Sequence, residues 1–473
     1  MSDIPQGEDG LALSEEEPRQ GHLLIYFSNI NEDVRRFIKE LPEEERLPEV
    51  HENIALGKRD LLTVLSRFAP EGDASHIVLV MPSAPEPEFV QYVQTLLNLK
   101  NLPTILSPKD GSGYTGADAH GDLQLVDQLK NLANEHQYTT VIGYAISPSV
   151  LRVANELETA LDVTQDQVVL TPDTGSNPLG TKSGLREFYD DNPGKAGFVM
   201  AEGEVFKQDY SGAIEAAARR YISEGAVVIK TNKGHSGLGV MIFTDGELKT
   251  DFDECVETLE QYMSAPYWQS FPIVVEQYIE ADTNLAGGNP SIEFYIDDEG
   301  PHLLYTCGMK VSPEGVFQGV EVLRDLLPTR VQKSLERTGL SVATALYESG
   351  YRGHHDVDCM IDTQDNVLVS EVNTRITGGS HVHYLAKYLF GDDYLDKTVI
   401  MAESMHRFSG VPITFSQMRD RLHGLLFDSA TNAGVILTGD SELLAQNKLG
   451  YIIFAPTREV AAEIQEKMYA LVG

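Results

Sequence analysis

The chain has 473 residues, more than one hydrophobic core usually supports, so two to four domains or subdomains with a cleft between them are expected. Hydrophobic residues make up 42% and charged residues 23%, a composition that excludes disorder everywhere except at the ends. The net charge of −36 repels polyphosphate backbones and anionic membrane surfaces, so no nucleic acid and no membrane partner are predicted. Such acidity fits either a high-salt host or ordinary solubility.

The first residues carry no targeting signal. Residues 1–20 are acidic where a signal peptide would be basic and then apolar, and they are expected to form a disordered tail. No stretch of about eighteen apolar residues occurs. Three widely spaced cysteines, Cys255, Cys307 and Cys359, indicate reduced and buried thiols. A cytoplasmic location follows.

Residues 21–175 alternate between short apolar runs and longer amphipathic ones. The runs at 22–29, 75–84, 102–108 and 138–145 are typical of buried strands. The segments between them carry apolar residues at helical spacing, most clearly over 122–136. This alternation predicts an open parallel α/β sheet covered by helices.

From residue 176 the pattern changes to helices followed by several strands. Strand patterns at 271–280, 291–298, 302–311, 356–362 and 367–373 surround a long helix at 328–349. They predict an α+β domain with mainly antiparallel sheets over 176–410. Residues 411–473 are predicted to be a small α+β cap.

An apolar strand ends in Lys230 and runs into a glycine-rich segment at 231–240. Gly234, Gly237 and Gly239 allow backbone N–H groups to approach an anion, and Lys230 adds a positive charge beside them. The segment is not a Walker motif, because no Gly-Lys-Ser/Thr closes it, and not a dinucleotide fingerprint, because another strand follows. Taken alone, it fits a phosphate site and a plain glycine-rich hairpin equally well.

Acidic and amide side chains gather on the predicted hairpin at 356–373. Because strand side chains alternate, Glu371 and Asn373 share one face, and a hairpin register can bring Asp358 onto it. Mg²⁺ prefers a few protein oxygens, with phosphate and water in its remaining positions. The alternative is a solvated hairpin, but Glu371 lies in an otherwise apolar strand, where an uncompensated carboxylate is costly.

These features, in this order, resemble the ATP-grasp superfamily over roughly residues 175–400. The resemblance rests on Lys230 with its glycine-rich segment, on the run 275–279, and on Asp358 with Glu371-Val372-Asn373-Thr374-Arg375. The preceding α/β region resembles a pre-ATP-grasp domain. The runs 175–182 and 373–381, together with the C-terminal cap, look most like the pheganomycin-type peptide ligases.

The resemblance implies an ADP-forming ligase that uses ATP and Mg²⁺, with Mn²⁺ as an alternative. A carboxylate would be phosphorylated to an acyl phosphate and attacked by an amine of an amino acid or peptide, in a biosynthetic reaction. The alternatives are an ATP-grasp kinase or phosphotransferase and a non-catalytic ATP-binding protein. A homo-oligomer is left open.

The resemblance also implies roles for individual residues. The residues expected to contact ATP are Lys182, Lys230, Lys233, Gly234, His235, Ser236, Gly237, Gly239, Glu276, Gln277, Tyr278, Ile279 and Glu293. The expected metal ligands are Asp358, Glu371 and Asn373. Arg375 and Lys230 are the expected catalytic cations, and the substrate site is expected at Arg375, Gly378, Gly379 and Ser380.

Several of these assignments have competing interpretations. Lys182 fits an ordinary solvated helix lysine as well as an ATP ligand. Glu276 would accept from the adenine amino group, and Glu293, with Asn284 behind it, would accept from the ribose. The Gly378–Ser380 turn also fits a helix start capped by Ser380. Asp356 stands where some amino-acid ligases carry an arginine, so Arg352 or Arg375 would take over that role.

Overall fold

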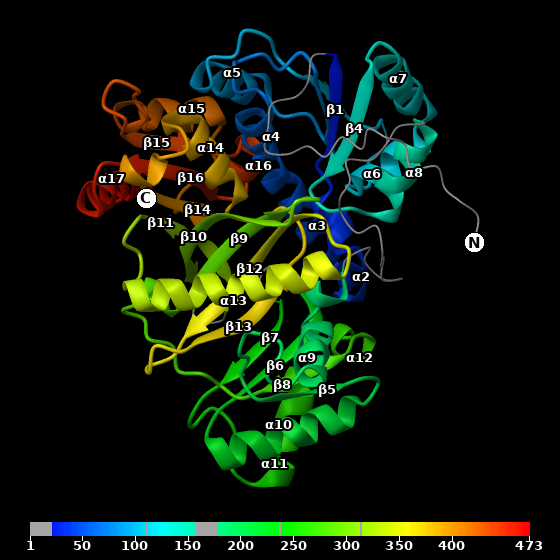
Figure 1. Ribbon diagram of the computed structural model, residues 1–473, viewed down its shortest axis with the longest axis vertical. Helices are drawn as coiled ribbons and strands as arrows, with labels where there is room; N and C mark the ends of the chain where they lie inside the picture. Colours follow the sequence, from blue (N-terminus) through cyan, green and yellow to red (C-terminus); the bar gives the residue numbers. More distant parts are fainter. Residues whose placement is uncertain (1–20, 110, 158–176, 236–237, 313–314) are drawn as a thin grey trace.

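The computed structural model describes residues 21–109, 111–157, 177–235, 238–312 and 315–473 (Figure 1). The predicted tail at 1–20, the boundary at 175–176, and Ser236 and Gly237 lie outside these ranges. None of the helices in the described ranges is long and apolar enough to cross a membrane.

The N-terminal domain is built on a four-stranded parallel sheet, as the alternating pattern predicts, with strand order β3-β2-β1-β4. Its strands are β1 (His22–Phe27), β2 (Ile77–Val80), β3 (Thr104–Leu106) and β4 (Tyr138–Gly143). Its helices are α1 (Ile30–Asp33), α2 (Arg35–Glu40), α3 (Glu43–Gly57), α4 (Asp60–Phe68), α5 (Pro87–Leu96), α6 (Thr115–Gly121), α7 (Leu123–Asn134) and α8 (Pro148–Glu156). Two apolar clusters cover the sheet because successive side chains point to opposite faces, Leu24 and Tyr26 into one cluster and Leu23 and Ile25 into the other.

A second, smaller lobe carries an antiparallel sheet of order β5-β8-β6-β7. Its elements are η1 (Pro178–Gly180), α9 (Lys182–Asp191), β5 (Gly203–Phe206), α10 (Tyr210–Glu224), β6 (Val227–His235), β7 (Leu238–Phe243), α11 (Phe252–Tyr262), α12 (Tyr267–Ser270) and β8 (Ile273–Glu276). Phe37 and Leu41, in and after α2, enter the core of this lobe, and the rings of Phe37 and Tyr267 lie 5.0 Å apart. The N-terminal domain is thereby attached to the small lobe.

The remainder of the chain forms one eight-stranded antiparallel sheet, in the order β13-β12-β9-β10-β11-β14-β16-β15. Its elements are η2 (Ala286–Gly288), β9 (Pro290–Ile296), β10 (Pro301–Val311), β11 (Phe317–Val322), α13 (Thr329–Glu348), β12 (Gly353–Ile361), β13 (Val367–Asn373), α14 (Ser380–Phe390), η3 (Tyr394–Asp396), β14 (Val399–Arg407), α15 (Phe415–Arg421), η4 (His423–Leu425), β15 (Gly434–Leu437), α16 (Ser441–Leu444), β16 (Lys448–Ala455) and α17 (Arg458–Val472).

The expected boundary between residues 410 and 411 does not separate two sheets. β14 pairs with β11 on one side and with β16 on the other, for example Met401 opposite Ile453. The predicted cap therefore extends the large sheet rather than standing apart from it. Figure 1 shows this sheet between the N-terminal domain and the small lobe, with α13 along its outer face.

Candidate nucleotide and metal site

The three parts of the chain meet around a cavity of ≈ 590 Å³. The small lobe contributes Lys230 and Glu276, and the large sheet contributes Asp358 and Glu371. Arg59 and Tyr144 of the N-terminal domain line the same cavity. Polar groups separated by hundreds of residues are thus collected in one place.

The strand-end lysine of β6 is paired with an acid of the neighbouring strand. Val228 lies opposite Glu276 in the β6–β8 register, so Lys230 and Glu276 point to the same face of the sheet. Lys230 Nζ lies 2.7 Å from Glu276 Oε2, and an Arg186 nitrogen lies 3.5 Å from Oε1. Burial would raise the pKa of Glu276, but Lys230 and Arg186 outweigh it and lower the pKa.

This pairing corrects the role expected of Glu276. Both of its carboxylate oxygens face cations of the small lobe, so an adenine amino group would have to compete with Lys230 and Arg186. Glu276 instead holds Lys230 toward the cavity. Lys230 Nζ also lies 3.4 Å from the carbonyl of Ser370, on the facing hairpin.

The glycine-rich segment forms the β6–β7 hairpin. A Cβ on Gly234 would lie 2.3 Å from the carbonyl oxygen of Leu238, and Gly239 has a φ of +87°. Both positions therefore require glycine for the hairpin itself. Gly234 also lines the cavity, and His235 lies in β6 with only its backbone described. The expectations for Ser236 and Gly237 fall outside the described residues.

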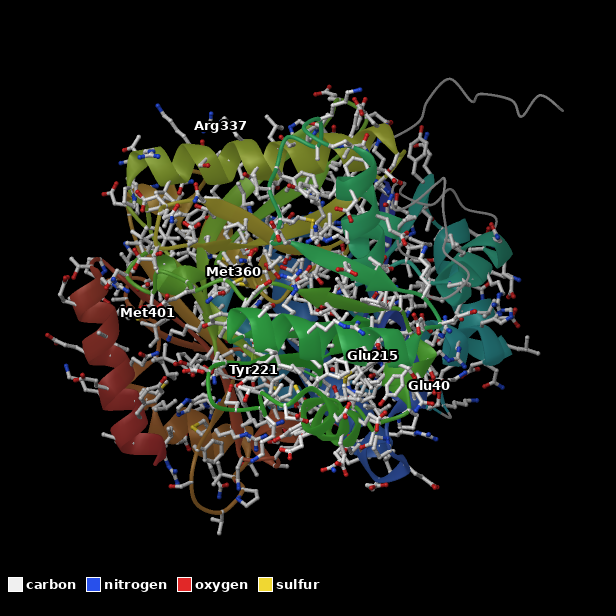
Figure 2. The ribbon with its side chains drawn as sticks, turned by 90° about the horizontal axis from the view of Figure 1, so that it is seen from below. Glu40, Glu215, Tyr221, Arg337, Met360 and Met401 are labelled. Carbon is white, nitrogen blue, oxygen red and sulfur yellow. The ribbon has the colours of Figure 1, made fainter. Side chains whose placement is uncertain are left out.

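The segment after β8 lines the cavity with Gln277, Tyr278 and Ile279, as a hinge beside a nucleotide would. The Gln277 N–H donates to the Glu202 carbonyl at 2.8 Å, which fixes the start of the segment. Apolar side chains from both lobes line the same cavity, namely Val228, Val240, Ile242, Met360 and Leu368. Met360 lies near the middle of the molecule (Figure 2). Apolar walls on two sides suit a flat aromatic base.

Lys182 is not a solvated helix lysine. It is the first residue of α9, whose N-cap Thr181 accepts from the Gly184 N–H. Its side chain is only 8% exposed, and its Nζ lies 2.6 Å from Glu371 Oε1. Burial would raise the pKa of Glu371, but Lys182, with Lys230 and Arg375, lowers it.

The acidic hairpin has the register that its alternation suggests. Asp358 lies opposite Glu371 and Asp356 opposite Asn373, so all four side chains lie on one face. The Asn373 side-chain amide donates to Asp356 at 3.0 Å and to Asp358 at 3.4 Å. Asp356, which sequence reasoning treated only as a missing arginine, therefore belongs to the cluster. Arg352 pairs with Asp298 at 3.0 Å instead.

Burial and neighbouring acids destabilise the ionised forms of the two aspartates in the cluster. Burial and the nearby Glu371 raise the pKa of Asp358 to about 7, and burial and Asp358 raise the pKa of Asp356. Asp358 Oδ1 is buried and has no hydrogen-bond partner in the described chain. A cation bound beside this oxygen would give it the polar partner that it lacks.

These residues fit Mg²⁺ bound together with phosphate rather than a metal held by protein alone. In the described chain, no group of three or more His, Cys, Asp or Glu side chains is arranged to hold an ion. Asp358 Oδ1 is free of hydrogen bonds in the described residues, whereas Glu371 is paired with Lys182. The Asn373 amide nitrogen faces Asp358 and its amide oxygen accepts from Arg375, so this side chain would have to turn to bind a cation. Mg²⁺ commonly takes one or two carboxylates and fills the rest of its octahedron with phosphate and water.

Arg375 connects the acidic hairpin to the N-terminal domain. Its guanidinium donates to Asp33 at 2.9 Å, Tyr144 Oη at 3.0 Å, and Asn373 Oδ1 at 3.2 Å. Burial would lower the pKa of Arg375, but Tyr144 and Asp33 raise it, so it stays charged. Lys233 Nζ lies 3.9 Å from Asp33, and burial lowers its pKa.

Glu293 lines the cavity, but both of its carboxylate oxygens already accept hydrogen bonds from inside the protein. It is 3% exposed and lies opposite Asp356 in the β9–β12 register. Tyr305 and Thr377 donate to Oε2 at 3.0 Å and 2.7 Å, and Ser380 donates to Oε1 at 2.5 Å. Glu293 therefore anchors the turn before α14 from inside.

The same network changes the interpretation of the Gly378–Ser380 turn. The Ser380 hydroxyl is buried and donates to Glu293, so it is directed away from a substrate. The residue at the helix cap is Gly379, without a side-chain hydrogen bond, so Ser380 is not the cap. Gly378 and Gly379 line the cavity, where their backbone remains a candidate for contact with a substrate.

Sequence reasoning missed the contribution of the N-terminal domain. Asp33 and Tyr144 lie just after β1 and β4, and Arg59 lies between α3 and α4. Ligands of open α/β sheets bind beyond the carboxyl ends of parallel strands, so the polar run after β1 and the segment after β4 carried a usable signal. Arg59 had no such signal.

Comparisons agree with this architecture. Residues 65–159 match the Pre ATP-grasp domain family. An ADP complex of N5-carboxyaminoimidazole ribonucleotide synthetase is similar in structure, with a TM-score of 0.55, 13% identity, and coverage of 96% of this chain and 97% of that one. The enzyme from Aspergillus clavatus, with ADP and 5-aminoimidazole ribonucleotide, has a TM-score of 0.54, 11% identity and coverage of 96% and 99%.

The biotin carboxylase domain of 2-oxoglutarate carboxylase from Hydrogenobacter thermophilus, solved with MgADP and bicarbonate, has a TM-score of 0.50 and 14% identity. The similarity covers 94% of this chain and 89% of that one. No curated protein matches the chain in a sequence search. Residues 65–159 thus match a Pre ATP-grasp domain, and the chain shares the overall fold of these solved structures.

Proposed function

We propose that the chain is an ADP-forming ligase that phosphorylates a carboxylate substrate and couples the acyl phosphate to the amine of an amino acid or peptide. The observation that carries the proposal is the composition of one cavity. Lys182, Lys230 and the hinge at 277–279 line it together with the acidic hairpin and Arg375. A cavity for a nucleotide alone would not require the acids.

The ion pair of Lys182 with Glu371 suggests how the nucleotide is received. The two side chains neutralise each other at 2.6 Å. A magnesium nucleotide offers a partner to each, phosphate to the lysine and the cation to the carboxylate. Mg²⁺ would neutralise charge on the phosphates as the γ-phosphoryl group is transferred. Lys230, oriented by Glu276, holds a second phosphate position.

In the first step a carboxylate oxygen of the acid attacks the γ-phosphorus, the bond to the bridging oxygen breaks, and ADP leaves. Arg375 donates to Tyr144 and to Asn373, so its guanidinium lies between these two side chains, where it can offset negative charge on the transferred group. In the second step the amine nitrogen attacks the acyl carbon, and inorganic phosphate leaves as the amide forms.

The experiment is an ATP-consumption assay over amino acids and short peptides, with products identified by mass. ADP and inorganic phosphate are expected, because the γ-phosphoryl group is transferred. AMP and pyrophosphate as the main products would contradict the proposal. Hydroxylamine added with the correct acid should trap a hydroxamate, whereas a kinase acting on an alcohol would yield none.

A further inference from the structure

Arg59 differs from every other buried cation that the structure describes. Its side chain is 8% exposed, in the short link between α3 and α4. The other lysines and arginines that are buried to this degree in the described ranges each face an acid, in the pairs Lys58–Glu442, Lys182–Glu371, Arg186–Glu276 and Lys448–Glu52. No carboxylate of the described chain lies within ion-pair distance of Arg59. A buried charge without a direct ion pair is costly, so it requires an explanation.

The contacts of Arg59 leave most of its donors unused. One guanidinium nitrogen donates to the Ser404 hydroxyl at 3.2 Å, and the described chain gives the side chain no other hydrogen bond. Its neighbour Asp60 lies beyond ion-pair distance. Burial raises the pKa of Asp60 to about 6, against the opposing charge of Arg59, so Asp60 offsets part of the charge of Arg59 through space but does not bond to the guanidinium. The guanidinium lines the cavity described above.

Arg59 lies at the end of the cavity that the nucleotide does not need. Ser404 and Met405 come from the far part of the large sheet, and Leu56 and Tyr144 come from the N-terminal domain. Tyr144 also receives the hydrogen bond from Arg375. Both arginines lower the pKa of Tyr144, against the larger effect of burial, so Tyr144 lies close to both. The position is thus beside the reacting group and not on the adenine side.

We infer that Arg59 binds a second carboxylate, one that is not phosphorylated, on a substrate of the proposed ligase. A planar guanidinium matches a carboxylate with two parallel hydrogen bonds. A phosphate dianion would call for a second cation, and Lys58 is already used by Ser83 and Glu442. The inference rests on the proposed function, and it assigns substrate selection to the pre-ATP-grasp domain.

The second carboxylate has two chemical sources, which the experiment separates. It belongs either to the acid partner, which is then a dicarboxylate, or to the amine partner, which is then a free amino acid or peptide. ADP release is measured with each acid and with its monoamide, and with each amino acid and with its carboxamide. The source is the partner whose amide form is rejected.

In the wild type, replacing the correct carboxylate by an amide is expected to lower kcat/KM about 100-fold, because the guanidinium is left unpaired. In Arg59→Met the two forms should differ less than about threefold, with the KM for ATP unchanged. Arg59→Lys should keep part of the preference, since it keeps the charge without the planar fork. Arg337→Met removes a charge from exposed α13 (Figure 2) and should behave as wild type.

A preference that persists in Arg59→Met, or an absence of preference in the wild type, would overturn the inference. If no acid stimulates ADP release, the proposed ligase function is wrong. The anion site is then tested on its own, by measuring thermal unfolding in the presence of succinate. Succinate should raise the Tm of the wild type and not that of Arg59→Met. Equal shifts, or no shift in either protein, would overturn the site as well.

Discussion

The two hairpins that face each other across the cavity balance their charges in opposite ways. On β6–β7 the cation Lys230 has its acid, Glu276, at 2.7 Å within the same sheet. On β12–β13 the acids Asp356 and Asp358 share an amide donor, and Asp358 Oδ1 has no hydrogen-bond partner in the described residues.

The β6–β7 hairpin therefore has its charge balanced within the protein, whereas the β12–β13 hairpin needs an added cation. A charge paired inside the protein mainly orients a side chain, as Glu276 orients Lys230. A buried acid without a partner raises the free energy of the folded chain until a cation arrives. We therefore expect different effects on stability and activity when a charged side chain is removed from each hairpin.

The largest effect is expected for Glu371→Gln. A neutral amide still hydrogen-bonds Lys182, so the chain should fold, but it cannot offset the charge of a magnesium ion. The rate of ADP formation should fall by at least about 100-fold, with ATP binding affected less. Asp365→Asn, in the exposed turn of the same hairpin, is the matched control. Equal rates in the two variants would remove Glu371 from the metal site.

On the facing hairpin, Lys230→Ala should weaken ATP binding by roughly 30-fold, about 2 kcal/mol, the usual worth of a charged hydrogen bond. Glu276 keeps Arg186 as a partner at 3.5 Å, so the lobe should remain folded. Equilibrium titration with a slowly hydrolysed ATP analogue measures the change. Lys249→Ala removes an exposed lysine of the same lobe and should bind like the wild type. Wild-type affinity in Lys230→Ala would contradict the assignment.

The contribution of a paired acid to stability can be measured at Glu403, which does not line the cavity. Burial would raise the pKa of Glu403, but His406, Lys310 and Tyr469 lower it from 4.5 to about 2. Because the folded-state pKa is the lower one, this stability is present above pH 4.5 and is lost as the pH falls toward 2. Glu403→Gln should lower the free energy of unfolding at pH 7 by about 1.5 kcal/mol.

Urea unfolding of both proteins between pH 7 and acid pH tests this, and the difference should shrink as the pH falls. Glu463→Gln, in an exposed pair with Lys467 at 3.7 Å, should change stability much less. A constant difference at all pH values would show that packing, and not charge, stabilises Glu403.

The smallest effect, and the one of opposite sign, is expected for Asp358→Asn. Removing a buried acid that has no cation partner and one oxygen without a hydrogen bond should raise the free energy of unfolding by about 1 kcal/mol in the absence of metal and nucleotide, while ADP formation falls. Asp362, in the same hairpin, accepts from Gln364 and Asn366 at 2.8 Å, so Asp362→Asn should instead destabilise slightly. A loss of stability in Asp358→Asn would mean that its charge is already balanced.

The sequence by itself was enough for the fold class and for the two hairpins. Strand alternation places Glu371 and Asn373 on one face because the period of a strand is two, and the expected hairpin register adds Asp358 to that face. The parallel pairing of β1 to β4 follows from alternating strands and helices, although their order in the sheet does not. These features depend on neighbours along the chain, so the sequence contains them.

Only the tertiary structure decided which charges meet. Arg375 donates a hydrogen bond to Asp33, 342 positions away in the sequence, and Arg59 donates one to Ser404, 345 positions away. The same packing joins Glu293 and Ser380 in an internal hydrogen-bond network, so their polar groups bond to each other although Glu293 still lines the cavity. The continuous sheet through β14 likewise joins the predicted cap to the large sheet. Local patterns encode which way a side chain points, whereas its partner depends on how distant elements pack.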